Sequence, residues 1–479
     1  MTHANVEYDL AVVGSGINGM VCALLAAQQG LRVLLVESYR SLGGGVRTEE
    51  LTLPGFRHDV CSAVHPFGRC SPILRELELE KEGLEWIDPT VPLAHPLLGE
   101  EAVLLHRDID QTALELGRPG KLYSAVMKNL VEVWPVLENQ LLGPALSLPD
   151  PALLWPLVRF GPAALAPASL LGRVFGRRGQ ALWSGLAGHS LLPMESLSSS
   201  AVACVLGLLA HRVGWPFPRG GSVKIAEALE AKLRRIGVDV ATNQKVSRLN
   251  ELPPSRAVVL DLSAKQVLQV MGPLLKPGVR AQLERFHLGP GVFKVDYALS
   301  DPVPWSDPRV NLAGTVHIGG TLGDIAVSER AVWQGRVSDR PFLLAVQPTV
   351  FDPTRAPAGK HVLWVYLHTP NGWRGDCLDV LENQLDRFAP GFREVVLKRS
   401  VMGAAEFTAY NPNYIGGDIL GGANTLWQVV ARPTWSLDPY HLGANVFCCS
   451  ASVPPGGGVH GMGGYHAFRS LGRKVFSFF

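Results

Sequence analysis

Apolar residues near the start of the chain predict a strand, a helix and a second strand. Residues 8–13 and 31–36 are predominantly apolar runs, which is typical of parallel strands that are buried on both faces. Residues 18–29 lie between them and are rich in Ala and Leu, so they predict a helix. Because parallel strands need such a crossover, the three elements together predict one βαβ unit.

The same pattern returns in two later parts of the chain. Residues 222–236 predict a helix that is followed by short strands at 237–241 and 257–260. Residues 445–449 predict another strand, and a turn rich in proline and glycine separates it from a helix that begins near Gly461. We therefore expect an α/β fold in which one parallel sheet is assembled from distant parts of the chain.

Two domains are expected for a chain of 479 residues that is 47% hydrophobic. The first, of Rossmann type, is predicted to be discontinuous and to comprise residues 1–70, 215–288 and 430–479. The second, an α+β domain for the substrate, is predicted to be inserted as residues 71–214 and 289–429. Strand-like runs in this insert lie at 292–299 and 361–368, and residues 141–214 predict a mainly helical, apolar segment.

The apolar segment allows two interpretations. Prolines interrupt it well short of the roughly 18 apolar residues that a membrane-spanning helix needs, so no spanning helix is expected. Its large side chains are either ordinary core or the wall of a lipophilic tunnel that opens on a monotopic membrane face. The aromatic residues are Trp134, Trp155, Phe160, Phe175 and Trp183, and the basic residues beside them are Arg159, Arg173, Arg177 and Arg178.

Charge and cysteine content exclude several classes of protein. The 44 basic and 42 acidic residues give a net charge of +2, which disfavours a nucleic-acid partner. The seven cysteines contain no CxxC pair and no metal-ligand spacing, so we expect neither a metal site nor the cysteine relay of a disulfide reductase. Scattered cysteines and the lack of a signal-peptide pattern at the start predict a cytoplasmic protein, associated with a membrane surface under the tunnel interpretation.

A glycine-rich turn joins the first predicted strand to the first helix. Gly14, Gly16 and Gly19 have the GxGxxG spacing, which allows a tight turn, close approach of the backbone to a pyrophosphate and close helix-to-strand packing. The start of the helix, with Ser15 and Asn18, supplies amide donors and the positive end of the helix dipole. The turn therefore predicts a dinucleotide site.

An acidic residue and a second glycine cluster follow the second strand. Glu37, with Ser38 beside it, can accept hydrogen bonds from ribose hydroxyls and disfavours a 2′-phosphate. Glycines then allow a loop to press against a bound nucleotide, and the cation after them can offset phosphate charge. This loop contains Gly43, Gly44, Gly45, Arg47 and Thr48. Its alternative interpretation is a plain surface turn.

The second glycine cluster resembles the GG-x-x-R-[ST] element of the FAD-dependent amine oxidase and phytoene desaturase superfamily. The resemblance extends across the chain, because residues 218–222 look like the PxGG segment of that superfamily and residues 450–465 look like its C-terminal flavin-binding sequence. It implies a Rossmann-type, glutathione-reductase-like domain that binds FAD. The further FAD contacts that it implies are Val246, Ser450, Gly457, Gly458, Val459 and Met462.

Within this superfamily, residues 314–320 and 347–353 are most similar to the phytoene-dehydrogenase-related subgroup. Two features depart from the superfamily's pattern. Only residues 251–255 stand where many members insert a small β-meander, and Cys449-Ser450 stands where many have Gly-Ala. A second glycine fingerprint for a pyridine nucleotide is missing, so the resemblance implies FAD without a permanent NAD domain.

The resemblance also implies the type of reaction. FAD makes hydride transfer to flavin N5 the expected chemistry, and the protein supplies position and proton transfer. The expected enzyme is an oxidoreductase, acting as a dehydrogenase, desaturase, saturase or isomerase on a hydrophobic, isoprenoid or lipid-like small molecule. Two alternatives stay open: a flavin amine oxidase that produces peroxide, and a non-catalytic flavin-binding protein with an interaction or redox-sensing role.

Candidate catalytic residues must lie near the flavin ring. Ser62 and His65 follow the second glycine cluster, and His460 and Tyr465 lie within or beside the C-terminal flavin sequence. Histidine can move protons near neutral pH, and a hydrogen-bonded structural role is the alternative for each of these histidines. Weaker candidates in the second insert are His317, Glu329 and His368.

Overall fold

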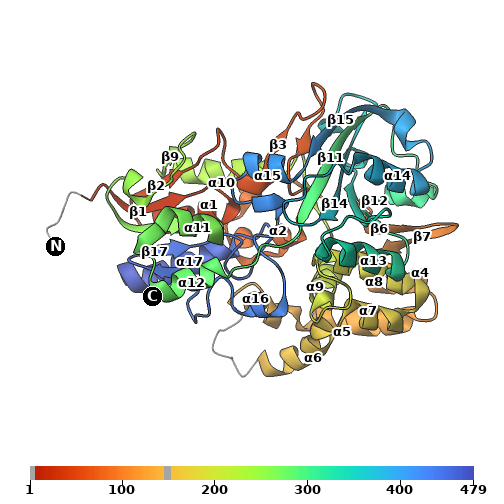
Figure 1. The fold of residues 1–479 in the computed structure, drawn as a ribbon, viewed down its shortest axis with the longest axis horizontal. Helices are drawn as coiled ribbons and strands as arrows, with labels where there is room; N and C mark the ends of the chain where they lie inside the picture. Colours follow the sequence, from red (N-terminus) through yellow and green to blue (C-terminus); the bar gives the residue numbers. More distant parts are fainter. Residues whose placement is uncertain (1–5, 145–152) are drawn as a thin grey trace.

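The computed structural model describes residues 6–144 and 153–479. Figure 1 shows two sheets side by side, one near the N-terminus and one above a group of helices. They are a six-stranded sheet of order β16-β17-β10-β1-β2-β9 and a seven-stranded sheet of order β15-β11-β14-β13-β12-β6-β7. The predicted α/β class is therefore confirmed, while the residue limits of the two domains stay a prediction.

The six-stranded sheet is assembled from three distant parts of the chain. Its strands are β1 (Tyr8–Val13), β2 (Val33–Val36), β9 (Asp239–Ala241), β10 (Ser255–Leu260), β16 (His441–Gly443) and β17 (Val446–Cys448). β1 pairs in parallel with β2 and β10, β10 in parallel with β17, and β2 in parallel with β9. β16 pairs antiparallel with β17. The carboxyl ends of the five parallel strands therefore meet at one edge, where sheets of this kind bind ligands.

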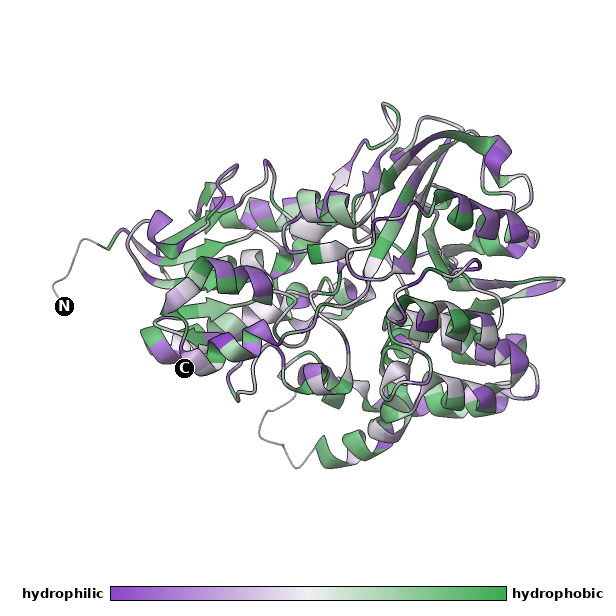
Figure 2. Cartoon of the chain, in the orientation of Figure 1, coloured by the Kyte–Doolittle hydropathy of each residue, from purple (hydrophilic) through white to green (hydrophobic). Residues whose placement is uncertain are grey.

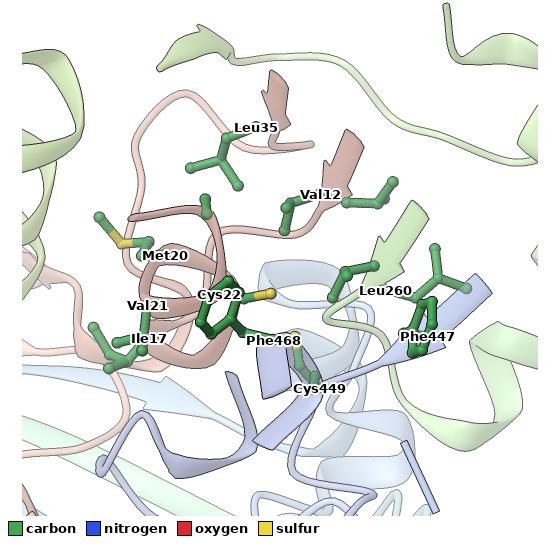
Figure 3. Packing of buried hydrophobic residues seen from close by; sticks show 14 of the residues in the cluster. Val12, Ile17, Met20, Val21, Cys22, Leu35, Leu260, Phe447, Cys449 and Phe468 are labelled. Carbon is green, nitrogen blue, oxygen red and sulfur yellow. The ribbon is translucent and has the colours of Figure 1, made fainter. Parts of the chain in front are cut away.

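The helices that pack beside this sheet are α1 (Ile17–Gln28), α10 (Val223–Arg235), α11 (Ala264–Met271), α12 (Pro277–Glu284) and α17 (Met462–Leu471). α17 approaches α1 closely, because a Cβ atom at Gly464 would lie 2.0 Å from the backbone oxygen of Asn18. Figure 3 shows the apolar core at this contact, where Cys22, Cys449 and Phe468 gather. The C-terminal helix is thus held against the first helix of the chain.

The seven-stranded sheet is mixed. Its strands are β6 (Val91–Leu97), β7 (Glu100–Leu105), β11 (Gly291–Leu299), β12 (Ala313–Ile318), β13 (Leu343–Val346), β14 (His361–Thr369) and β15 (Val396–Met402). β6 and β12 pair in parallel, and the other neighbours are antiparallel. β11 and β14 contain the strand-like runs predicted at 292–299 and 361–368.

Helices cover one face of the seven-stranded sheet (Figure 1). They are α4 (Ile109–Glu115), α5 (Gly120–Leu141), α6 (Leu154–Leu165), α7 (Ala168–Leu171), α8 (Gly176–Gly188), α9 (Ser199–Arg212) and α13 (Leu322–Trp333). Trp134, Phe175 and Trp183 are fully buried among them. Phe175 and Trp183 are ordinary core, whereas Trp134 also lines a cavity. α14 (Leu378–Phe388) packs in a separate apolar core with other residues of the sheet.

Short elements complete the fold. They are β3 (Thr48–Glu49), β4 (His58–Asp59), α2 (Pro66–Cys70), α3 (Pro72–Glu76), β5 (Trp86–Ile87), β8 (Phe217–Pro218), α15 (Ala404–Tyr410) and α16 (Leu426–Val430). β3 pairs with β4, and β5 pairs with β8. Residues 242–254, all of them described, contain no strand, which agrees with the short connection expected in place of a β-meander.

Several element boundaries and environments can be compared with the sequence predictions. The strand predicted at 8–13 agrees with β1, whereas those predicted at 31–36 and 237–241 begin later, at Val33 and Asp239. All seven cysteines are unpaired and buried. Among the described residues, no single helix is both long enough and apolar enough to cross a membrane. The helical segments 154–165 and 168–188 meet the two criteria only when taken together, and a bend of 91° separates them.

Candidate functional site

A cavity of about 580 Å³ extends between the two sheets. One end is lined by Gly14, Glu37 and Asp261, at the carboxyl edge of the six-stranded sheet. The other end lies between the seven-stranded sheet and α9, and we call it the apolar chamber. The apolar chamber is lined by Trp134, Phe160, Val202, Val205, Leu206, Trp215, Leu344, Val346, Trp364 and Tyr366. A polar, glycine-rich end thus opens directly into an apolar one.

The glycine-rich turn after β1 forms the polar end of the cavity. Gly14 has φ +96°, a conformation that favours glycine, and a Cβ at Gly19 would lie 2.2 Å from the backbone oxygen of Gly14. Ser15, Gly16 and Asn18 line the cavity, whereas Gly19 is behind the turn and does not. The first amides of α1 therefore face a space that can hold an anion.

Glu37 is held at the end of β2 by hydrogen bonds from its neighbours. Ser15 donates to Oε2 of Glu37 from its backbone nitrogen (2.9 Å) and its hydroxyl (2.5 Å). The amide of Tyr39 and the hydroxyl of Ser38 donate to Oε1. Glu37 and Ser38 both line the cavity, so the carboxylate is positioned beside the glycine turn, where a ribose would lie in a dinucleotide fold.

Asp261 is a buried carboxyl group that sequence reasoning missed. It directly follows β10, and its Oδ2 accepts a hydrogen bond from the amide of Gly19 at 3.2 Å. A Cβ at Gly16 would lie 2.4 Å from the same oxygen. Burial, with a smaller contribution from Glu37, raises the pKa of Asp261 to about 7. A carboxyl group with a pKa near neutral therefore lies against the glycine-rich turn.

The second glycine cluster lies across from the first. A Cβ at Gly44 would lie 3.0 Å from Cα of Gly16, so the two glycine-rich turns are in contact. Gly43, Gly44, Gly45 and Arg47 all line the cavity. Arg47 is buried, pairs with Glu37 at 3.4 Å and donates to the backbone oxygen of Ser41. Its charge is thus already balanced within the protein, which differs from the expected role of offsetting phosphate charge.

Thr48 and Val246 do not line the cavity. The hydroxyl of Thr48 donates to Asp59 at 2.7 Å and accepts from the amide of Val223 at 3.1 Å, so it fixes the start of α10. Val246 is buried in the core of the six-stranded sheet. Both residues therefore support the site from behind in this structure, whereas the resemblance implied direct contacts with the cofactor.

The C-terminal flavin sequence divides between the cavity and the core. Ser450, Gly457, Gly458 and Val459 line the cavity. Met462 does not, because it begins α17 and is buried in the core of the six-stranded sheet. Cavity-lining residues therefore come from the turn before α17, while the helix itself serves packing.

The two predicted catalytic histidines are both buried in the cavity wall. Nε2 of His65 lies 2.7 Å from the hydroxyl of Ser222, and burial lowers the pKa of His65 to about 4. Nδ1 of His460 accepts a hydrogen bond from the amide of Met462, so its other nitrogen carries the proton toward the backbone oxygen of Gly456. Burial lowers the pKa of His460 to about 4 as well. Neutral His460 therefore braces the turn.

The other two candidates are placed differently. Ser62 lines the cavity, with its amide bonded to the backbone oxygen of Gly45. Tyr465 lies on α17 outside the cavity lining, with its hydroxyl 3.4 Å from Arg469. The structure thus brings Ser62, His65 and His460 to one cavity and separates Tyr465 from them.

Two buried cations near the cavity were also missed. Arg432 lines the cavity, and its Nε has no hydrogen-bond partner among the described residues. Lys294 on β11 pairs with Asp296 beneath the wall of the apolar chamber, with its Nζ 5.6 Å from the ring centroid of Trp364. Neither lies in a recognisable short motif, because each becomes part of the site only through strand pairing or chain folding.

The tunnel interpretation of the apolar segment is partly supported. Phe160 lines the cavity, while Trp155 is 64% exposed on the same helix. The basic residues of this region do not form a free patch, because Arg159, Arg177 and Arg178 pair with glutamates. Their paired positions contradict the idea that these arginines are all available for lipid headgroups.

Comparisons with known proteins support the nucleotide-binding geometry. A family model for an NAD(P)-binding Rossmann-like domain matches residues 12–77. Pyridine nucleotide-disulfide oxidoreductase domain-containing protein 2 of Rattus norvegicus is 25% identical to this chain, over 98% of this chain and 94% of its own. A 4,4'-diapophytoene desaturase of Methylomonas is 22% identical, over 80% of this chain and 78% of its own.

Solved structures show the same fold. Putrescine oxidase with putrescine bound superposes with a TM-score of 0.62 at 16% identity, covering 97% of this chain and 98% of that one. The chain is similar to oxidoreductases of the FAD-type superfamily that includes desaturases and amine oxidases. The predicted superfamily, fold and enzyme class are thereby confirmed. The site is accordingly one for a flavin or nucleotide cofactor.

Proposed function

We propose that this oxidoreductase binds FAD and oxidises an apolar, isoprenoid or other lipid-like molecule. The observation that supports this most is the continuity of the cavity, from the glycine turn at Gly14 to the apolar chamber. When bound, FAD supplies a hydride acceptor at N5. The chain's own residues bind the nucleotide at one end, hold an apolar molecule at the other and exclude water between them.

The residues at the polar end fit FAD. The first turn of α1 presents amides without intrahelical partners to a pyrophosphate, and the Glu37 carboxylate is held beside them. Buried Arg432, whose Nε has no hydrogen-bond partner in the described part of the chain, adds a cation to the cavity wall beside Gly456. Gly16 and Gly44 are in contact, so side chains at these two positions would not fit. The bare backbone of both turns can therefore lie against a nucleotide. These features favour a long dinucleotide over a small ligand.

The apolar chamber favours a neutral substrate over an amine. Among the described residues that line the cavity, the carboxyl groups are Glu37 and Asp261, both at the glycine turn. A protonated amine in the apolar chamber would therefore lose its hydration without gaining a carboxylate partner, which is costly in free energy. Amine oxidation nevertheless stays the second candidate, because the fold is shared with putrescine oxidase.

Anaerobic titration of the FAD-loaded protein tests the proposal. A lipid extract is expected to bleach the oxidised-flavin absorbance, whereas putrescine and other polyamines are expected to leave it unchanged. Ala201→Phe on α9 fills the cavity lining and is expected to slow the bleaching, and exposed Ala231→Phe on α10 serves as the matched control. Bleaching by polyamines alone supports amine oxidation. A protein that takes up no FAD even after reconstitution contradicts the proposal.

Access from a membrane surface is part of the proposal. α6 contributes Phe160 to the cavity lining and α16 contributes Val429, so both helices border the cavity. The same helices expose Trp155 and Trp427, which are 64% and 76% exposed. Figure 2 shows α6 as a largely hydrophobic helix at the edge of the molecule. Exposed tryptophans beside an apolar cavity are typical of helices that lie in a lipid interface.

Vesicle binding tests this access route. The wild-type protein is expected to sediment with vesicles of phosphatidylcholine and phosphatidylglycerol, and Trp155→Glu with Trp427→Glu is expected to lose this binding because charge at the interface opposes insertion. Leu114→Glu on α4 changes another exposed apolar residue and is expected to have no effect. Equal sedimentation of all three proteins contradicts the route.

A further inference from the structure

Four histidines, three of them buried, lie at the far end of the apolar chamber and have no role in the proposal so far. His189, at the end of α8, contacts His317 on β12, with their Nε2 atoms 2.8 Å apart. His95 on β6 donates from Nε2 to the backbone oxygen of Gly320 at 2.7 Å. His368 on β14 pairs with Glu329. No three His, Cys, Asp or Glu residues in the described ranges are placed to share a metal ion.

His189 is the member of this group that faces the cavity. It lines the cavity and is partly accessible, whereas His95, His317 and His368 are buried. Its ring centroid lies 5.8 Å from that of Trp215, which also lines the apolar chamber. One nitrogen of His189 is engaged by His317, so the second nitrogen is the polar atom that the ring can offer to a bound molecule.

The buried partner determines which atom His189 offers. Nδ1 of His317 is buried without a hydrogen-bond partner among the described residues. A buried unpaired N–H is rarer in proteins than a buried acceptor with a bare lone pair, so the proton of His317 belongs on Nε2. Nε2 of His317 then donates to Nε2 of His189. His189 consequently carries its own proton on Nδ1, the nitrogen not held by His317.

His95 and His317 both approach Gly185 on α8. A Cβ at Gly185 would lie 2.7 Å from Nδ1 of His317 and 2.8 Å from Nδ1 of His95, so both nitrogens face the same glycine. Because His95 donates from Nε2 to Gly320, its Nδ1 is an acceptor. Burial, with a smaller contribution from His368, lowers the pKa of His189 to about 3. The donor that reaches the apolar chamber is therefore a neutral N–H group.

We propose that His189 is a specificity-determining residue that donates a hydrogen bond to an oxygen of the bound molecule, so that the preferred ligand is an apolar chain with one carbonyl group. This inference rests on the proposed function for the identity of the apolar chamber as the substrate site. A pure hydrocarbon leaves the N–H without an acceptor, and a protonated amine brings a second donor to it. An aldehyde or ketone satisfies it without bringing charge into an apolar space.

His317 acts in this proposal as a positioning residue. It contacts His189 but does not line the cavity, and its ring lies among Trp215, Phe342 and His95. These contacts fix the ring of His317 and hence the direction from which Nε2 of His189 is engaged. Replacing His317 is therefore expected to affect the carbonyl preference without removing the apolar wall of the chamber.

Equilibrium dialysis of the FAD-loaded protein with three probes tests the proposal. The probes are 2-undecanone, undecane and undecylamine, which share one chain length and differ in their polar group. The wild-type protein is expected to bind 2-undecanone roughly threefold to tenfold more tightly than undecane, the effect of one neutral hydrogen bond. Undecylamine is expected to bind more weakly than the ketone at pH 7.

Variants assign the preference to the histidine pair. His189→Phe is expected to abolish the ketone preference and keep the undecane affinity, while His189→Gln, which retains an N–H donor, is expected to restore part of it. His317→Phe is expected to reduce the ketone preference, and exposed His287→Phe is expected to leave it unchanged. Equal binding of ketone and alkane by the wild-type protein, or a preference that survives His189→Phe, overturns the proposal.

This readout is separate from the proposed function. The ratio of ketone to alkane affinity does not depend on flavin reduction, and the FAD content of each variant is measured by its absorbance. A protein that binds the ketone through His189 but shows no flavin bleaching by lipids would contradict the proposed reaction alone. A protein that is bleached by lipids but shows no ketone preference would contradict the role of His189 alone.

Discussion

Ser15 donates two hydrogen bonds to one oxygen of Glu37, from its amide at 2.9 Å and from its hydroxyl at 2.5 Å. This contact joins the glycine turn after β1 to the end of β2 and sets the carboxylate before any ligand binds. We expect Glu37→Gln to weaken FAD binding roughly tenfold to hundredfold, because a hydrogen-bond acceptor loses its charge. Fluorescence titration of the apoprotein with FAD measures the change.

Exposed Glu50→Gln is the matched control for this variant. It removes the same charge without touching the cavity lining. If both variants bind FAD with wild-type affinity, Glu37 does not contact the nucleotide.

Asp261 predicts a pH dependence of stability. Its pKa is raised from 3.8 to about 7 in the folded protein, so the folded state holds a proton that the unfolded state has lost between these values. The contribution of Asp261 to stability is therefore present below pH 3.8 and is lost as the pH rises through 7. We expect Asp261→Asn to raise the melting temperature of the apoprotein at pH 8 by about 1 °C per kcal/mol of relieved desolvation cost, and to change it little at pH 4.

Differential scanning fluorimetry at pH 4, 6 and 8 measures this effect. Asp9→Asn is a suitable control, because Asp9 lies at the start of the same sheet and is partly exposed. A wild-type protein and an Asp261→Asn variant with parallel melting curves across this range would show that Asp261 is ionised throughout.

The buried charge of Arg432 is also expected to contribute to FAD binding. It is a fully buried cation in the cavity wall, and burial lowers its pKa to about 10. An anionic cofactor offsets the cost of burying this charge, so Arg432→Met is expected to weaken FAD binding by about tenfold, the effect of one charge-assisted hydrogen bond. Arg432→Lys is expected to recover part of the affinity.

The FAD dissociation constant is measured for both variants and for exposed Arg374→Met. An affinity that falls equally in Arg432→Met and Arg374→Met reflects net charge and not the buried site. Unchanged affinity in Arg432→Met shows that the cation faces only the protein.

The buried pair Lys294 and Asp296 predicts that removing one partner destabilises the protein much more than removing both. Burial raises the pKa of Asp296 to about 6, although Lys294 opposes this rise. Lys294→Met is expected to destabilise the protein by roughly 3–5 kcal/mol, because it leaves a buried carboxylate without its partner. Lys294→Met combined with Asp296→Leu is expected to recover most of that loss.

Urea unfolding of the apoprotein measures the two effects as a double-mutant cycle. Lys398→Met on the exposed strand β15 is the control. Additive losses in the double variant would show that the two groups are not coupled.

Local patterns predicted the elements whose residues are close in sequence. β1 and the GxGxxG turn were placed correctly because a buried strand, a turn and a helix start are all specified within a few residues. For neighbouring residues near the C-terminus, the sequence did not show which ones line the cavity and which ones do not. His460 lines the cavity whereas Met462 and Tyr465, after the turn into α17, do not, and this difference depends on the direction in which the helix leaves the turn.

The groups that sequence reasoning missed depend on distant pairing. Asp261 accepts from Gly19, which is 242 residues away, and His189 meets His317 across 128 residues. The residues next to Asp261 and His189 in the sequence show no spacing pattern that predicts such a distant partner. His317 was considered only as a weak candidate, because its partner on α8 was not known from the sequence.

The order of strands has a consequence for biosynthesis. β17 and α17 come from the last part of the chain, yet they complete the sheet and core around the first strand and helix. The ribosome must therefore synthesise the chain through α17 before the pocket at the glycine turn can close. Products that end before β17 are expected to expose an unfinished parallel sheet, so cofactor uptake would distinguish them from chains that contain α17.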